Sequence, residues 1–174
     1  MIKIKFLFLF SIITFKSFAQ DDYIKLPNAK THNPTFIYNN DIIGSEYAMK
    51  AFKISKEEIQ KLVEEVYVLK DRQNRGLNNY YNLTEHGLLF LELKKEAPII
   101  PSKTQAELNT FFGLNELSDI YVDGYLVESK DYKICLIEIS DIEIVYPKND
   151  NKLKNRVLNI WTLQKDKRYR TDIK

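Results

Sequence analysis

Short apolar runs bounded by turn residues are the main pattern along the chain. The clearest runs cover residues 35–38, 66–69, 88–94, 139–146 and 157–163, and they are rich in β-branched, leucine or aromatic side chains. Glycine, proline, asparagine or aspartate lies close to most of their ends. Runs of this length between turn residues are typical of strands. The pattern therefore predicts a protein built mainly from short strands.

The segment after Ser55 is predicted to be a helix. Ser55 and Glu58 have the spacing of a capping box, in which each side chain binds the other residue's backbone amide. Apolar residues then recur with the i, i+3, i+4, i+7 spacing of one helical face, namely Ile59, Leu62, Val63 and Val66. We expect this helix to lead directly into the strand at 66–69.

A second capping box and a hairpin are predicted later in the chain. Thr104 and Glu107 have the capping-box spacing, and Gly113 is placed to end the helix near Phe112. Asp123-Gly124 lies between two apolar runs, which is the strongest short signal for a two-residue hairpin turn.

The two halves of the chain show an internal similarity. Residues 36–43 and 120–127, 84 positions apart, both read as an apolar strand, a polar turn and a short apolar run. The later runs continue the correspondence, with 88–94 matching 157–163. Self-similarity of this kind suggests a repeated unit. Pro98 and Pro101 interrupt the chain between the halves.

The first nineteen residues are predicted to be an export signal. Lys3 and Lys5 precede a short apolar run, and Ser17 and Ala19 have the small-residue spacing that a signal peptidase needs. The run is too short to span a bilayer. The alternatives are an uncleaved anchor or a buried strand. The signal contains no cysteine, so we expect no lipid anchor.

These observations divide the chain into six parts, with two small modules of mixed sheets and short helices giving an α+β fold. The predicted parts are a signal peptide at 1–19, a flexible leader at 20–34, module 1 at 35–96, a linker at 97–103, module 2 at 104–165 and a polar tail at 166–174.

The order of these motifs resembles the plug domain of TonB-dependent outer-membrane receptors, in the form common in Bacteroidetes. The matching pieces are Val122-Asp123-Gly124, Ile54-Ser55, 68–71, Tyr80-Tyr81 and 87–94. They are split between the halves, and Asn39-Asn40 stands where the family has Asp-Gly. The resemblance implies plug-like α+β modules. It does not imply a receptor, because no sequence remains to build the large barrel of that family.

Removing the signal changes the charge. The precursor has 26 basic and 24 acidic residues, and loss of Lys3, Lys5 and Lys16 leaves 23 against 24, a net charge of −1. A near-neutral chain lacks the basic surface that nucleic acid or anionic lipid requires. We therefore expect neither partner, and no transmembrane segment in the mature chain.

Candidate chemistry is sparse. His32 and His86 are the two histidines, and neither lies in a zinc-binding pattern. His86 follows Glu85 ahead of a strand, where it could assist proton transfer or simply occupy an exposed turn. Tyr80-Tyr81 in a polar loop is the candidate for an interaction surface. Cys135 is the single cysteine and lies in an apolar stretch, so it is predicted to be buried.

The sequence therefore predicts an exported, non-catalytic binding or accessory protein of a Gram-negative bacterium. It would act in the periplasm or at the cell surface, bind a protein or small ligand of the cell envelope, and need no cofactor or metal. Tyr80, Tyr81 and His86 are the candidate interaction residues. Two alternatives remain: a small secreted hydrolase with a site near His86, and a lipocalin-like carrier, which needs about eight regular strands.

Overall fold

The computed structural model describes residues 25–29, 33–50, 52, 55–70, 81–137, 139–150 and 152–168. The predicted signal at 1–19, His32 and Tyr80 lie outside these residues. The fold is α+β, as predicted, with two mixed sheets and a few short helices.

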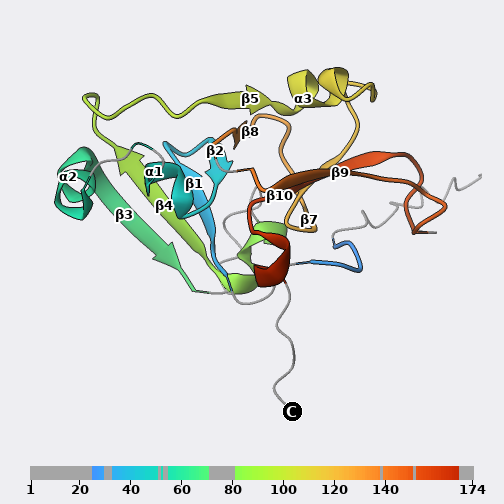
Figure 1. The fold of residues 1–174 in the computed structure, drawn as a ribbon, viewed down its shortest axis with the longest axis horizontal. Helices are drawn as coiled ribbons and strands as arrows, with labels where there is room; N and C mark the ends of the chain where they lie inside the picture. The colour runs from blue at the N-terminus through green and yellow to red at the C-terminus, as the bar shows by residue number, and fades with distance from the viewer. Residues whose placement is uncertain are drawn as a thin grey trace, which may run out of the picture.

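The larger sheet has six strands in the order β3-β4-β1-β2-β8-β5 (Figure 1). Its pairs are antiparallel except β1 with β4 and β2 with β8, which are parallel. The strands are β1 (Thr35–Tyr38), β2 (Ile42–Gly44), β3 (Val63–Leu69), β4 (Leu88–Leu93), β5 (Ser102–Thr104) and β8 (Lys133–Cys135).

The smaller sheet has four strands in the order β7-β6-β10-β9. β6 and β10 are parallel, and the two outer pairs are antiparallel. The strands are β6 (Ile120–Val122), β7 (Tyr125–Leu126), β9 (Asp141–Val145) and β10 (Val157–Trp161). The predicted Asp123-Gly124 hairpin joins β6 to β7, and both of its residues have positive φ.

The predicted correspondence between the halves is present in the strand order. In the first half β1 forms a hairpin with β2 and lies parallel to β4, which pairs with β3. In the second half β6 forms a hairpin with β7 and lies parallel to β10, which pairs with β9. The orders β3-β4-β1-β2 and β9-β10-β6-β7 therefore have the same connectivity along the chain and the same parallel and antiparallel pairs.

The sheets do not divide at the predicted linker. β5 includes Ser102 and Lys103 of the segment 97–103, and Ile100 is buried. β5 and β8, which both follow the prolines, join the sheet formed by strands β1 to β4. One hydrophobic cluster also contains residues from both halves, including Ile37 and Leu88 with Ile120 and Leu158. Strands of the second half thus complete the sheet of the first.

The helices are short, and buried residues of α1 and η1 pack into the hydrophobic clusters of the sheets. They are α1 (Tyr47–Lys50), α2 (Lys56–Leu62), α3 (Gln105–Phe111) and the 3-10 helices η1 (Tyr81–His86) and η2 (Lys165–Lys167). Both predicted capping boxes are formed, at Ser55 with Glu58 and at Thr104 with Glu107. None of the helices in the described part of the chain has the length and apolar character of a membrane span.

The prediction that the helical face extends to Val66 is wrong. α2 stops at Leu62, and Val63 already begins β3. The amide of Lys94, just after β4, donates to the Leu62 carbonyl at 2.9 Å. Pairing with β4 therefore takes over the residues whose spacing fits a helix, because a long-range ladder overrides local periodicity.

The described residues of the predicted leader and polar tail pack against the fold. In the leader, Leu26 and Ala29 are buried. In the tail, the buried Arg168 side chain lies 4.4 Å from the centre of the Trp161 ring and donates to the Leu163 carbonyl at 2.9 Å. An arginine stacks on tryptophan through its planar cation, which a count of polar residues does not reveal.

Candidate functional site

His86 lies at the end of η1 and contacts the second half of the chain. Its Nε2 lies 3.0 Å from the hydroxyl of Tyr125 in β7, and the two rings meet edge to face. The Glu85 carboxylate lies 4.0 Å from the same nitrogen. The His86 side chain is 18% exposed. It therefore joins η1 to β7 and is not an exposed turn residue.

The leader completes this polar cluster. The ammonium of Lys25 binds Glu85 at 2.7 Å and lies 5.1 Å from the centre of the Tyr125 ring. Burial raises the pKa of the Tyr125 hydroxyl. Partial burial lowers the pKa of Lys25, but hydrogen bonds to Glu85 and Tyr125 outweigh it, so the net pKa is raised. Lys25 thus stays charged and holds the leader across β7.

The other predicted interaction residues are not joined to His86. Tyr80 lies outside the described residues, and Tyr81 begins η1, where only its backbone is described. Within the described ranges, no group of three or more histidine, cysteine or acidic side chains is placed to hold a metal ion. Cys135 is buried, as predicted.

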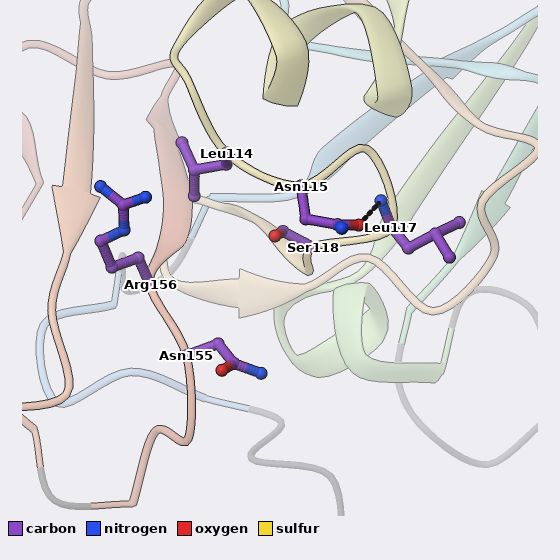
Figure 2. Close-up of a pocket in the computed structure, with 6 residues that line it drawn as sticks. All are labelled: Leu114, Asn115, Leu117, Ser118, Asn155 and Arg156. Carbon is purple, nitrogen blue, oxygen red and sulfur yellow. Dashed lines mark hydrogen bonds between the residues drawn. The ribbon is translucent and has the colours of Figure 1, made fainter.

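A separate pocket of about 420 Å³ lies between the loop after α3 and the start of β10. Its lining residues, drawn in Figure 2, are Leu114, Asn115, Leu117, Ser118, Asn155 and Arg156. Figure 2 shows the Arg156 guanidinium well apart from the amides of Asn115 and Asn155. Arg156 donates to the Gly113 carbonyl at 3.3 Å, and Asn115 accepts from the Leu117 amide at 2.9 Å. Arg156 and Asn115 thus bind backbone atoms of the loop after α3, and their polar groups do not converge on one ligand position.

β3 is the most exposed apolar element of the described residues that forms a sheet edge. It pairs with β4 alone and borders the six-stranded sheet, with α2 at its start (Figure 1). Three consecutive apolar residues in it are more than half exposed: Val66 at 52%, Tyr67 at 57% and Val68 at 55%. An edge strand presents unpaired amide and carbonyl groups along its open side. Here those groups lie beside an apolar surface.

The two faces of β3 follow from its register with β4. Tyr67 pairs with Phe90 of the core, while Val66 and Val68 pair with Leu91 and Leu89 on the opposite face. A register shift between Val63 and Glu65 marks a bulge near the start of the strand. Bulges and charged residues commonly protect an edge from pairing, and this protection does not reach Val66–Leu69.

The sequence predicted a strand at 66–69 but not that it lies at an edge. Strands β1 and β4 lie in the interior of the sheet, and their side chains are buried or partly buried. Those of β3 are mostly exposed, although all three strands contain apolar runs. The adjacent glutamates at 64 and 65 are the one local signal of exposure. Comparison with known families, curated proteins and solved structures found no match to this chain.

Proposed function

We propose that this chain is an exported binding protein without catalytic activity of its own, which binds a partner protein by adding an extended segment of the partner to β3. The observation that carries the proposal is the open edge of β3 with Val66, Tyr67 and Val68 exposed. The predicted export signal supports a location in the cell envelope, where an envelope protein would be the available partner.

Strand addition suits this edge better than a pocket-based interaction. The seven residues of β3 span about 23 Å at roughly 3.3 Å per residue. Backbone hydrogen bonds supply affinity in this mode, and alternating side chains supply selectivity. Each such bond contributes about 0.5–1.5 kcal/mol net. The flanking valines on one face and Tyr67 on the other would select apolar side chains at the three consecutive partner positions that lie opposite them.

The plug-like resemblance is compatible with this function because it implies a binding module and not an enzyme. His86 fits the same interpretation. Its contact with Tyr125 joins η1 to β7, and the neighbouring Glu85 binds Lys25 of the leader. A polar group with such partners is accounted for by its structural role.

A short probe peptide tests the proposal. The probe is a fluorescein-labelled peptide of alternating threonine and valine, compared with a version N-methylated at every residue, which has no amide hydrogen to donate on either edge. We expect the first to bind and the second not to bind in fluorescence anisotropy. Val68→Lys should abolish binding, and Ile99→Lys is the matched control, because Ile99 is 90% exposed and lies outside the strands. Equal anisotropy with both peptides would contradict strand addition.

A further inference from the structure

The geometry of β3 points to a second copy of this chain as the partner. We infer that β3 pairs with β3 of the second copy in an antiparallel arrangement centred on Tyr67, joining two six-stranded sheets into one. This inference rests on the proposed function, since it names the occupant of the same edge. The reason lies in the order of charged and apolar residues along the strand.

Symmetry restricts how two copies of one strand can pair. A two-fold axis through an antiparallel pair places a residue opposite its own copy, so the register must be centred on a single residue. Three centres bring the exposed apolar residues together, namely Val66, Tyr67 and Val68. The three registers differ in what they place opposite the charged ends of the strand.

The register centred on Tyr67 is the self-complementary one. It places Val66 opposite Val68 of the second copy. By residue count it also brings Glu64, the residue at the bulge, opposite the second copy's Lys70, which directly follows β3. Because the arrangement is symmetric, both pairs occur twice. Lys70 and Glu64 are exposed, so their charges can meet across the axis. Opposite charges at facing positions of a sheet are favourable.

The neighbouring registers place exposed apolar residues of the described strand opposite charged ones. A centre at Val66 places Glu64 opposite Val68 and Lys70 opposite Leu62, so each charge faces an apolar residue. A centre at Val68 places Lys70 opposite Val66, and it places Glu64 opposite Arg72, which lies outside the described residues. Charge complementarity of this kind fixes register more than it adds affinity.

The side chains on each face complete the interface. Val66 and Val68 share the face of Leu91 and Leu89, so four valines from two copies would extend an apolar surface that already exists. Tyr67 shares the face of Phe90, so two tyrosines would meet at the axis. Burying half-exposed apolar side chains is favourable. A β-branched and aromatic composition also suits cross-strand pairs.

The interface is small, so we expect a weak dimer. One strand per copy buries less than the roughly 800 Å² per partner of a standard interface. A dissociation constant on the order of 10 µM is consistent with an interface of this class. The dimer should therefore be visible by sedimentation at concentrations above that value and dissociate on dilution.

Charge exchange tests the register directly. Lys70→Glu places like charges opposite each other, and Glu64→Lys does the same, so each single variant should weaken the dimer about 10-fold. The double variant restores opposite charges with reversed sign and should recover the original dissociation constant. Val68→Lys should weaken the dimer about 100-fold, and Ile99→Lys should leave it unchanged, both measured by sedimentation velocity.

A cysteine at the axis gives an independent test. In the proposed register the two Tyr67 Cα atoms lie about 4.5–5.5 Å apart, a separation that a disulfide can bridge. Tyr67→Cys should therefore form a covalent dimer on mild oxidation, and Ile99→Cys should not. Cys135 is buried in both proteins and serves as the shared background.

The outcomes separate the inference from the proposed function. A chain that stays monomeric at 300 µM yet binds the threonine–valine peptide overturns the self-pairing and keeps the binding edge. A dimer that is unaffected by Val68→Lys overturns self-pairing through β3. A dimer that the double charge variant fails to restore overturns the register. A monomer that binds no peptide overturns both proposals.

Discussion

Gly124→Ala is expected to release the leader from the fold. Gly124 has φ +86° in the β6–β7 turn, and a Cβ there would lie 2.6 Å from the Cα of Ala29 and 2.6 Å from the Asn28 carbonyl oxygen. Both are backbone atoms, so no side-chain rotation relieves the contact. The Leu26 amide also donates to the Gly124 carbonyl at 2.8 Å. The leader must therefore move away from the turn.

The magnitude follows from two separate effects. Alanine in the left-handed region costs about 1–2 kcal/mol. Moving the leader exposes Leu26 and Ala29, which are 4% and 7% exposed in the folded chain. Exposing a buried leucine alone costs about 1.5–3 kcal/mol. The total is about 2.5–5 kcal/mol of unfolding free energy.

Gly113→Ala is the matched control. Gly113 has φ +69°, but a Cβ built there meets no atom within 4 Å. Its substitution therefore includes the backbone term and not the displacement of a neighbouring segment. We expect a loss of about 1–2 kcal/mol. The difference between the two variants isolates the contribution of the packed leader.

Urea unfolding followed by fluorescence measures both losses. Trp161 is the single tryptophan and is 1% exposed, so its emission reports on the folded core. The expected gap between the variants is about 1.5–3 kcal/mol, which corresponds to roughly 3–12 °C in melting temperature for a chain of this size. Trypsin should cleave after Lys25 faster in Gly124→Ala. Equal destabilisation of the two variants, with unchanged cleavage, would refute the packed leader.

Three further predictions concern single side chains. Arg168→Met should cost about 1–3 kcal/mol by urea unfolding, because it removes a stacked cation over Trp161. Hydrogen bonds from the backbone and side chain of Thr104 lower the pKa of Glu107, so its stabilising effect is present above pH 5 and lost as the pH falls through and below 4.5. Glu107→Gln should therefore reduce the loss of stability measured on acidification from pH 6 to 3. Cys135 is 3% exposed, so a thiol reagent should label it only after unfolding, and rapid labelling of the native chain would contradict its burial.

Local signals in the sequence predicted much of the secondary structure. The capping boxes at Ser55 and Thr104 begin α2 and α3, and Asp123-Gly124 forms the hairpin. These elements are determined by hydrogen bonds among residues two or three positions apart. The correspondence between the strands of the two halves could also be predicted, because it rests only on the spacing of apolar runs and turns along the chain.

The pairing of strands that are far apart in the chain could not be predicted from the sequence. β8 lies between β7 and β9 in the chain, yet it joins the other sheet beside β2. The Asp41 carboxylate accepts from Lys133 at 2.8 Å at this junction, across 92 residues. No local pattern identifies a strand partner so far along the chain. The sequence therefore predicted two separate modules, whereas β5 and β8 of the second half belong to the sheet of the first.

The candidate site was predicted only in part. His86 was identified as a titratable residue, but its partner Tyr125 lies 39 positions away, and the ion pair of Glu85 with Lys25 spans 60 positions. The exposed edge was not predicted, because a strand of valine and tyrosine is equally typical of a sheet interior. Exposure depends on neighbours, which only the fold supplies.

The equivalent topology of the halves provides an internal comparison for the open edge. β9 occupies in the smaller sheet the position that β3 occupies in the larger one. β9 exposes Asp141 and Glu143 while Ile142 and Ile144 pack on the core, an alternation typical of a protected edge. Arg168 also binds Asp141 at 3.3 Å. β3 lacks this alternation over Val66–Val68, so the same position in the same topology is protected in one half and apolar in the other. Since the topology does not require an exposed apolar edge, its presence on β3 favours a binding role over a structural one.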